Sequence, residues 1–530
     1  MEHEFDEAAL SPPDDPVSAA ATDRLGIPYL YPYQRFVVAG ILDCLQADGQ
    51  YDASADQPPT CQIVILPTGA GKSLCFQLPA ILNPGPTVVV YPLLGLMADQ
   101  ERRLQSQGIA CLTLRGGMTA EERDRLFADL EAGRANFLIT NPETLANPPL
   151  LERLAGLDIG HFVIDEAHCV AEWGDSFRPA YLELGACIQR LKPRVTTAFT
   201  ATASPAILSR LVEVLFAGAP YRLVSANADR PNLRYEVRCG LSARKLLRDA
   251  VRASAKPLIV FVPSRSGCEI TARDLKVRLP GLDVKFYHAG LERDEKTTIE
   301  QWFLASRDGV LCATCAYGMG MDKPDIRTII HAAAPGSVEA YLQEAGRAGR
   351  DGREARAILL NAGQTRRPAN QPLGNPGDQA ADPADRSASL MALAAARAQV
   401  MQDYASQHSS CRRSYLLRAL GAPDVACAGC DVCAGGAVGQ DPDGSAIRAV
   451  VSRHRRRFTL QTAGAFLAGS AAQPRLTGHG ALSAWQSDEI DEALQAGLKD
   501  GSLVRLGGRL WKNHLVPGRP APLDRFTPRH

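Results

Sequence analysis

The sequence predicts an α/β protein with two parallel-sheet domains, followed by a short cysteine-rich segment and a small module of helices and strands. Two observations predict this fold class. Short, uninterrupted apolar runs alternate with helical patterns over two long stretches, as buried parallel strands and their crossover helices do. The 530 residues are 45% hydrophobic and 22% charged, which is enough apolar material for large cores without disulfide bonds.

The elements follow one another in a regular order. The apolar runs assigned to strands of the first domain are Gln62–Leu66, Thr87–Tyr91, Asn136–Thr140, His161–Asp165 and Val195–Thr200. Those of the second domain are Leu258–Val262, Asp283–Tyr287, Gly309–Thr314, Thr328–His331 and Ala355–Leu360. A helical pattern over Ala388–Gln407 comes next, and a last helix over Trp485–Lys499 precedes a short hairpin.

Changes in composition set the expected boundaries. We divide the chain into an acidic disordered tail (1–24), a first α/β domain (25–228), a second α/β domain (229–362), a linker rich in Pro, Gly, Gln and Asn (363–387), a helical cysteine-containing subdomain (388–436), a small module (440–516) and a tail (517–530).

Composition also limits the kind of protein. Lysine and arginine total 58, as do aspartate and glutamate, so the chain as a whole is not basic. No apolar run approaches the ~18 residues of a membrane helix, so we expect no membrane partner. The acidic first residues lack the apolar core of a secretory signal, and the 14 cysteines then indicate thiols or metal ligands in a reducing cytoplasm.

A glycine-rich loop, Leu-Pro-Thr-Gly-Ala-Gly-Lys-Ser over 66–73, lies between a predicted strand and a predicted helix. In this context glycines let backbone N–H groups face phosphates, and the helix N-terminus adds positive potential. Lys72 would reach the β- and γ-phosphates and Ser73 would hold Mg²⁺. The alternative is a turn that only caps a helix. The residues assigned to the phosphates are Thr68, Gly69, Ala70, Gly71, Lys72 and Ser73.

An acidic pair ends the apolar run His161–Asp165, about ninety residues after the glycine-rich loop. Ligands bind at the carboxyl ends of parallel strands, so this position suits a catalytic group. Asp165 fits the coordination shell of Mg²⁺, and Glu166 fits the group that orients and deprotonates the attacking water.

Four cysteines, Cys411, Cys427, Cys430 and Cys433, have the spacing Cys-x₁₅-Cys-x₂-Cys-x₂-Cys. Four thiolates suit tetrahedral Zn²⁺ with no position open for water, so the metal would be structural. The alternative is four buried free thiols. A second pair, Cys312 and Cys315, is rejected as ligands, because residues three apart on a strand point to opposite faces.

Taken together, the motifs resemble those of the RecQ family of superfamily 2 DNA helicases, with this chain as a divergent bacterial-type member. The resemblance covers roughly residues 26–432. The matching motifs, in the family's order, are Gln34 after Leu30-Tyr-Pro-Tyr, the glycine-rich loop, Tyr91–Gln100, Asp165-Glu-Ala-His168, Phe199–Ala203, Tyr287–Leu291, Ala316–Pro324, Gln343–Gly352 and the four cysteines.

The resemblance implies two RecA-like domains, a zinc-binding subdomain and a winged helix. It implies that Gln34 reads adenine, although Tyr31 stands where the family usually has arginine. Arg347 and Arg350 lie in a glycine-rich turn of the second domain, from which a guanidinium can stabilise a transferring phosphoryl group. We assign Arg350 as the arginine finger and Arg347 as a supporting contact.

The segment after the acidic pair resembles the family's aromatic-rich loop, which links DNA contact to ATP hydrolysis. His168 precedes it; Trp173 and Phe177 would stack on bases, and Arg178 would bind phosphate. Asp-Ser at 175–176 replaces the usual His-Asp. The alternative is that both aromatic rings pack on the protein.

The predicted hairpin turns at Gly507-Gly508 and opposes Val504 with Trp511. This register puts Val504, Leu506, Arg509 and Trp511 on one mostly apolar face, with Trp511 anchoring the hairpin. It leaves Arg505 and Lys512 to meet DNA phosphates.

These expectations combine into an ATP-dependent DNA helicase that couples hydrolysis to 3′-to-5′ translocation on single-stranded DNA and unwinds duplexes in repair or recombination. Its cofactors would be ATP, Mg²⁺ and Zn²⁺, and its partners single-stranded and duplex DNA. A single-stranded-DNA-binding protein is the candidate protein partner, and the bacterial cytoplasm or nucleoid the expected location. The alternatives are an RNA helicase, a translocase that does not unwind, or a DNA-binding adaptor with an inactive ATPase.

Overall fold

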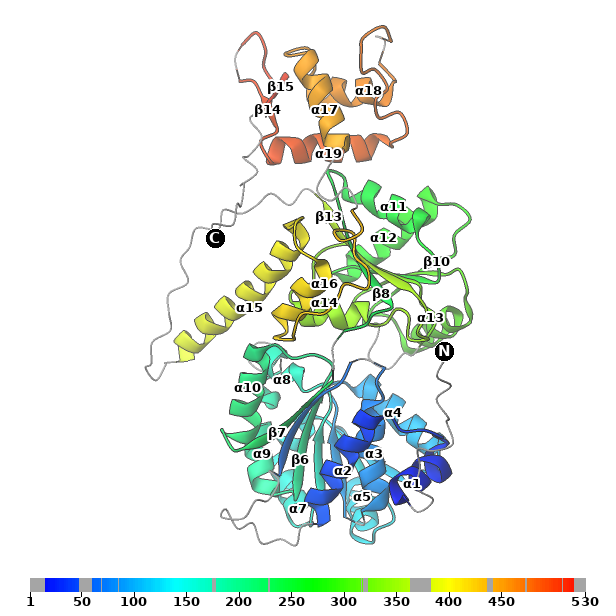
Figure 1. Cartoon of the computed structure of the whole chain (residues 1–530), viewed down its shortest axis with the longest axis vertical. Helices are drawn as coiled ribbons and strands as arrows, with labels where there is room; N and C mark the ends of the chain where they lie inside the picture. Colours follow the sequence, from blue (N-terminus) through cyan, green and yellow to red (C-terminus); the bar gives the residue numbers. More distant parts are fainter. Residues whose placement is uncertain are drawn as a thin grey trace, which may run out of the picture. The chain divides into compact units, whose positions relative to one another are not determined.

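The computed structural model describes residues 15–46, 60–67, 69–83, 85–173, 178–226, 229–315, 317, 323–362, 383–435, 442–471, 474–507 and 509–518. The chain divides into two compact units (Figure 1). The first holds the residues up to Asp229 together with Leu417–Pro423, and the second holds most of the remainder. In the part of the chain so described, no helix has the length and apolar character needed to cross a bilayer.

A seven-stranded sheet with the order β3-β4-β2-β5-β6-β1-β7 forms the centre of the first unit. All its neighbouring strands are parallel, so their carboxyl ends share one edge. The loops after the adjacent strands β5, β6 and β1 therefore emerge side by side. The strands are β1 (Cys61–Ile65), β2 (Thr87–Val90), β3 (Cys111–Thr113), β4 (Phe137–Thr140), β5 (His161–Ile164), β6 (Val195–Thr200) and β7 (Tyr221–Ser225).

Helices cover both faces of this sheet, as a parallel sheet requires. Alternate residues of β1 enter different cores: Val64 packs with α1–α4, whereas Ile63 and Ile65 pack with α5–α10. The helices are α1 (Pro16–Leu25), α2 (Pro32–Gln46), α3 (Lys72–Leu82), α4 (Leu94–Ser106), α5 (Ala120–Glu131), α6 (Pro142–Leu145), α7 (Pro148–Ala155), α8 (His168–Trp173), α9 (Leu184–Leu191) and α10 (Pro205–Phe216).

Helix α1 corrects the prediction of a disordered tail over 1–24. The Asp15 side chain accepts hydrogen bonds from the first backbone N–H groups of the helix, and Pro16 occupies its first position. Gly26 closes the helix in the left-handed conformation, and Ala21 and Leu25 are buried. The prediction relied on the acidic composition of this segment and so missed a capped helix with an apolar side. Residues 1–14 lie outside the described part.

The second unit contains a six-stranded parallel sheet with the order β10-β11-β9-β12-β13-β8. Its strands are β8 (Leu233–Gly240), β9 (Leu258–Phe261), β10 (Val284–Tyr287), β11 (Val310–Ala313), β12 (Thr328–His331) and β13 (Ala355–Ala362). Its helices are α11 (Ala243–Ala253), α12 (Arg265–Arg278), α13 (Arg293–Ala305) and α14 (Val338–Ala345). The prediction of two parallel α/β sheets is confirmed.

The ten predicted strands are present, with ends that differ by at most two residues. The prediction missed β3, β7 and β8. Strands β7 and β8 are edge strands that alternate between covered and exposed residues, so they lack the continuous apolar run used to find strands. Strand β3 has only three residues.

The cysteine-containing segment begins with α15 (Pro383–Ser406) and continues through α16 (Arg412–Ala419). Helix α15 starts five residues before the predicted Ala388, so the predicted linker is wrong for 383–387. The rest of that linker, 363–382, lies outside the described residues.

The C-terminal module consists of α17 (Pro442–Arg453), α18 (Leu460–Ala468), α19 (Ser487–Lys499), β14 (Leu503–Arg505) and β15 (Leu515–Pro517). These elements share one apolar core, in which Phe466, Ile490, Leu494, Leu503 and Leu515 are almost completely buried. Three helices followed by an antiparallel ribbon give the element order of the predicted winged helix, which stays a prediction.

The predicted hairpin register is wrong. Strand β14 pairs with residues beyond 514, so that Val504 opposes Val516 and Arg505 opposes Leu515. The chain returns to the ribbon only after the 506–514 loop, where Asn513 has a left-handed φ of 66°. Trp511 therefore lies in the loop, 44% exposed, and does not anchor the ribbon. Gly508 lies outside the described residues, so the turn itself is not described.

A buried cluster of ion pairs joins α19 to α11 and α12 within the second unit. The Glu489 carboxylate is fully buried and lies 2.8 Å from Arg248 Nη1 and 3.2 Å from Arg278 Nη1. The Ser242 hydroxyl donates to Glu492 Oε2 at 2.6 Å. The two arginines are also nearly buried. Arg248 has Asp249 as a second partner and Arg278 has Asp274 and Asp488, but Glu489 is the fully buried carboxylate that both arginines share.

We expect Glu489→Ala to lower the local stability of α19 by ~1.5–3 kcal/mol, because both guanidinium groups would lose their buried hydrogen-bond acceptor while keeping the more exposed Asp249, Asp274 and Asp488. Hydrogen–deuterium exchange of the α19 and α11 amides would measure the change. Glu354→Ala is the matched control, since its 3.1 Å pair with Arg234 is about half exposed, and we expect at most ~1 kcal/mol there. Equal effects of the two variants would contradict the prediction.

Candidate nucleotide and metal sites

The glycine-rich loop connects β1 to α3 at the carboxyl edge of the first sheet. Gly69 and Gly71 have left-handed φ angles of 87° and 75°, which residues with a Cβ rarely adopt. Lys72 is the first residue of α3, and Gly71 is its N-cap. The loop thus presents a helix N-terminus of the kind that binds phosphate. Thr68 lies outside the described residues.

Gln34 links α2 to the glycine-rich loop. Its side chain is 4% exposed, its amide nitrogen donates to the Ala70 carbonyl at 3.0 Å, and its amide oxygen accepts from Tyr31 N–H at 2.9 Å. The Tyr33 hydroxyl donates to the same Ala70 carbonyl at 3.3 Å. Gln34 therefore lies against the glycine-rich loop, its contact with adenine stays a prediction, and Tyr33 is a neighbour that the sequence did not reveal.

The acidic pair follows β5, which is separated from β1 by the single strand β6. Asp165 is 6% exposed, and its carboxylate accepts a hydrogen bond from Glu166 N–H at 2.9 Å. Burial raises the pKa of Asp165, and the Glu166 carboxylate raises it further, while Lys72 and the Glu166 N–H oppose them. A divalent cation would relieve this unfavourable buried charge at Asp165.

Glu166 lies close to the lysine of the glycine-rich loop. Its Oε1 is 3.8 Å from Lys72 Nζ, and both side chains are largely covered. Its Oε2 is 3.5 Å from His168 Nδ1, and the same ring nitrogen is 3.2 Å from the Thr200 hydroxyl. The first unit thus brings together Lys72, Glu166 and His168, and ties them to the end of β6 at Thr200.

The predicted aromatic loop is largely beyond what the structure describes. Phe177 and the side chain of Trp173 lie outside the described residues. Arg178 is described: its guanidinium donates to the Pro92 carbonyl, and its Nε lies 3.2 Å from Glu143 Oε1. A phosphate contact by Arg178 would have to compete with this carboxylate.

The two predicted arginines lie in the turn that follows α14 in the second unit. Arg347 is 5% exposed and Arg350 is half-buried. Between them Gly349 has a φ of 60°, and a Cβ there would lie 2.8 Å from the Arg353 carbonyl oxygen. The turn therefore requires glycine at 349.

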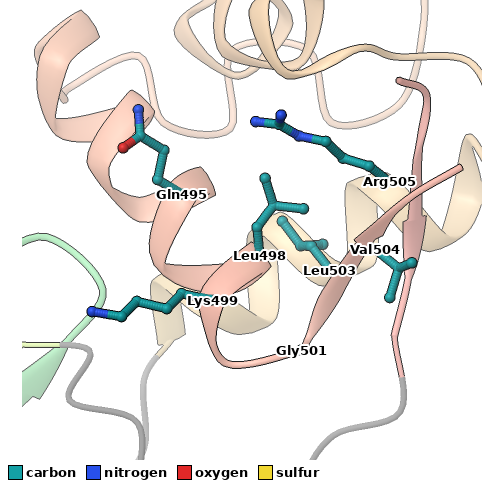
Figure 2. Close-up of a pocket in the computed structure, with 7 residues that line it drawn as sticks. All are labelled: Gln495, Leu498, Lys499, Gly501, Leu503, Val504 and Arg505. Carbon is teal, nitrogen blue, oxygen red and sulfur yellow. The ribbon is translucent and has the colours of Figure 1, made fainter. Parts of the chain in front are cut away.

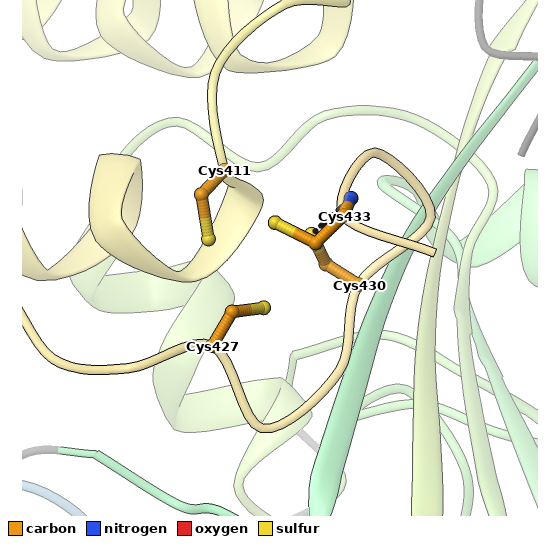
Figure 3. A group of neighbouring side chains, drawn as sticks. All are labelled: Cys411, Cys427, Cys430 and Cys433. Carbon is orange, nitrogen blue, oxygen red and sulfur yellow. Dashed lines mark hydrogen bonds between the residues drawn. The ribbon is translucent and has the colours of Figure 1, made fainter. Parts of the chain in front are cut away.

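The four predicted zinc ligands lie together (Figure 3). The Sγ atoms of Cys411, Cys427, Cys430 and Cys433 all lie within 4.8 Å of one another. Burial raises the pKa of Cys411, but hydrogen bonds from Ser414 in α16 and from the Cys427 and Cys433 thiols together outweigh it and lower the pKa overall. Neighbouring thiols raise the pKa of Cys433. Four thiolates this close need a cation, and Zn²⁺ with about 2.3 Å bonds fits the cluster.

Buried charge supports the zinc-ligand loop. Arg412 is fully buried, and its Nε donates to Asp431 Oδ1 at 3.0 Å. The other Asp431 oxygen accepts a hydrogen bond from Val237 N–H at 2.9 Å. The backbone of Cys430 pairs with that of Tyr235 in an isolated parallel β-bridge. The loop therefore continues the second sheet beyond its edge strand β8, an arrangement that cysteine spacing alone does not reveal.

The C-terminal module has an open hollow of about 590 Å³ between the end of α19 and β14 (Figure 2). Leu498 and Leu503 lie in its lining together with Lys499 and Arg505 (Figure 2). Arg505 and Lys512 are both exposed, as the phosphate-contact prediction requires, although the register that predicted them is wrong.

Comparisons with known proteins place each part of the chain. Residues 49–210 match the DEAD/DEAH box helicase family, 242–352 the helicase conserved C-terminal domain, and 380–434 the RecQ zinc-binding family. The fold and the motifs therefore define a superfamily 2 helicase core with a zinc-binding segment.

The ATP-dependent DNA helicase RecQ of Synechocystis sp. is 36% identical over 340 residues, covering 62% of this chain and 68% of that protein. The probable ATP-dependent DNA helicase RecS of Bacillus subtilis is 39% identical over 303 residues, covering 57% of this chain and 60% of that protein. The chain belongs to the RecQ family. It spans 31% of another relative, the RecQ-like DNA helicase blm-1 of Caenorhabditis elegans.

Solved structures agree on the fold. The helicase MrfA bound to DNA superposes with a TM-score of 0.52 at 21% identity, covering 66% of this chain and 52% of that one. Mss116p bound to single-stranded RNA superposes with a TM-score of 0.51 at 20% identity, covering 66% and 72% of the two chains. These similarities establish the two RecA-like domains.

We expect the purified protein to contain about one zinc per chain, and Cys430→Ala to lower this content and destabilise the segment from α15 to 435. Elemental analysis and limited proteolysis would measure both effects. The control is Cys315→Ala, an exposed cysteine outside the cluster. Equal zinc loss in the control, or zinc-free wild-type protein, would contradict the assignment.

Proposed function

We propose that the protein is an ATP-dependent DNA helicase that couples ATP hydrolysis to 3′-to-5′ translocation on single-stranded DNA and unwinds duplexes. The observation that carries the proposal is the cluster of Lys72, Glu166 and His168 beside the glycine-rich loop, in a chain that belongs to the RecQ family. The direction of movement and a role in repair or recombination are extended from that family.

The chemistry assigned to the first unit follows from the positions of its side chains. The backbone of 69–71 would bind the phosphates, with Lys72 adding charge at the β- and γ-phosphates. Ser73 and Asp165 would hold Mg²⁺, which supplies charge neutralisation at the phosphates when bound. Glu166 would orient the attacking water and accept its proton, and His168 would transmit the state of the site to β6 through Thr200.

The second unit supplies the remaining charge in this proposal. Arg350 acts as the arginine finger on the transferring phosphoryl group, and Arg347 gives a supporting contact. A protein with both arginines and an intact Lys72 and Glu166 retains the groups that hydrolysis needs. This argues against an adaptor whose ATPase is inactive.

We expect Lys72→Ala to abolish DNA-stimulated ATP hydrolysis, and Glu166→Gln to bind ATP but hydrolyse it about 100- to 10,000-fold more slowly, as loss of a general base does. Steady-state hydrolysis and binding of a fluorescent ATP analogue would separate the two effects. Lys276→Ala, at an exposed position of α12, is the control for lysine loss. Normal turnover in Glu166→Gln would exclude its assigned role.

The nucleic-acid partner is tested by comparing ATP hydrolysis with single-stranded DNA, duplex DNA and RNA. We expect single-stranded DNA to stimulate most. Stimulation by RNA alone would favour the RNA-helicase alternative, and stimulation by DNA without strand separation would favour a translocase. Equal hydrolysis rates with and without nucleic acid would contradict the DNA helicase, the RNA helicase and the translocase alike.

For the C-terminal module, we propose that Arg505 and Lys512 contact DNA phosphates. Replacing both with alanine should weaken duplex binding at every sequence and lower the slope of log affinity against log salt by about two. Arg234→Ala is the control, because that exposed arginine pairs with Glu354 in another part of the unit. An unchanged slope would remove the ribbon from the DNA interface.

A further inference from the structure

The turn that carries Arg347 and Arg350 has few backbone hydrogen bonds to a strand, so other groups must hold it in shape. It begins at Gly346, where α14 ends, and the carbonyl oxygens there have the partial negative charge of a helix C-terminus. Gly349 N–H donates to Ile326 at 2.9 Å. The carbonyl oxygens of the turn have a different partner.

Arg230 binds three carbonyl oxygens of this turn with one side chain. Its Nη1 donates to Gly346 at 3.0 Å, and its Nη2 donates to Ala348 at 3.2 Å and to Gly349 at 2.8 Å. A planar guanidinium has its donors in a fixed geometry, so it fixes the relative positions of the carbonyls that it binds. Those carbonyls flank Arg347 and directly precede Arg350.

Asn232, two residues after Arg230, binds the same turn. Its side-chain nitrogen donates to the Gly349 carbonyl at 2.8 Å and to the Arg353 carbonyl at 2.9 Å. The same nitrogen would lie 2.6 Å from a Cβ at 349, so the amide fits against the glycine. Two neighbouring side chains therefore bracket the segment that contains Arg350.

The zinc-binding segment holds Arg230 in turn. Arg413 is 1% exposed; its Nη1 donates to the Arg230 carbonyl at 3.0 Å, and its Nη2 donates to the Leu233 carbonyl. Its guanidinium carbon lies 5.3 Å from the centre of the Tyr235 ring, and the backbone of Tyr235 forms the β-bridge with Cys430. The backbone at Arg230 is thus itself held by a buried side chain of the zinc-binding segment.

We propose that Arg230 is a positioning residue for ATP hydrolysis: its guanidinium fixes the turn so that Arg347 and Arg350 are held ready to act on the phosphates. The proposal rests on the proposed function, because it assigns Arg230 no contact of its own with nucleotide. It places part of the control of hydrolysis where the second RecA-like domain meets the zinc-binding segment.

Arg230→Ala should lower kcat for DNA-stimulated ATP hydrolysis by about 10- to 100-fold, the size of effect that misplacing a catalytic group produces. KM for ATP should stay within about threefold, since phosphate binding belongs to the first unit. Zinc content and binding of a fluorescent ATP analogue would show that the variant is folded. A kcat within about twofold of wild type would overturn the proposal.

A double-mutant cycle separates positioning from a general loss of structure. If Arg230 acts through the turn, Arg230→Ala on an Arg350→Ala background should cost much less than it costs in the wild type. The same fractional loss on both backgrounds would overturn the proposal. If Arg350→Ala itself leaves kcat unchanged, the finger assignment in the proposed function fails, which is a distinct result.

A second variant and a matched control complete the test. Asn232→Asp puts a carboxylate against the Gly349 and Arg353 carbonyls, so it should lower kcat and spare KM as Arg230→Ala does. Lys256→Ala removes a cation that binds the carbonyls of Val251 and Ser254 at the end of α11, neither of which belongs to the turn. It should leave kcat unchanged; an equal loss in this control would overturn the proposal.

Discussion

The parallel arrangement of the first sheet is the constraint on which the candidate site depends. Since every strand runs the same way, the segments that follow β1, β5 and β6 must leave from one edge of the sheet. This alone brings the glycine-rich loop near the acidic pair, although about ninety residues separate them in sequence. Side-chain contacts then complete the site: Lys72 reaches Glu166, and His168 reaches Thr200 at the end of β6.

In the second unit, guanidinium groups bind two segments that lie outside the sheet. The turn after α14 and the loop of zinc ligands both lie outside the strands, and their carbonyls and carboxylates would be costly to leave unbound. Arg230, Arg412 and Arg413 bind them. Edge strand β8 connects the three, because Arg413 binds the backbone at its start and Asp431 binds Val237 within it. The zinc-ligand loop also covers an edge that would otherwise be open to other strands.

How much the sequence predicted depended on whether the signal was local. The continuous apolar runs gave the central strands, because such strands are buried on both faces, and the glycine, acid and cysteine patterns gave the sites. Edge strand β8 was missed, since its exposed residues interrupt the run. The predicted hairpin register was wrong because Gly507-Gly508 is a typical turn sequence, whereas the observed pairing brings Leu515 to β14 and into the module's core. The sequence did not indicate the role of Arg230, because its partners are backbone atoms more than a hundred residues away.

The backbone at Glu166 shows what the site demands of this residue. Its φ is 48°, in the left-handed region where a residue with a Cβ costs ~1–2 kcal/mol relative to its ordinary conformation. Glycine would avoid that cost but would remove the carboxylate. The strained conformation is fixed on both sides, since Glu166 N–H binds Asp165 Oδ1 and Ala167 N–H binds the Phe199 carbonyl. In this conformation one carboxylate lies between Lys72 and His168, so the chain places a charged group at this point at the expense of the local stability that glycine would give.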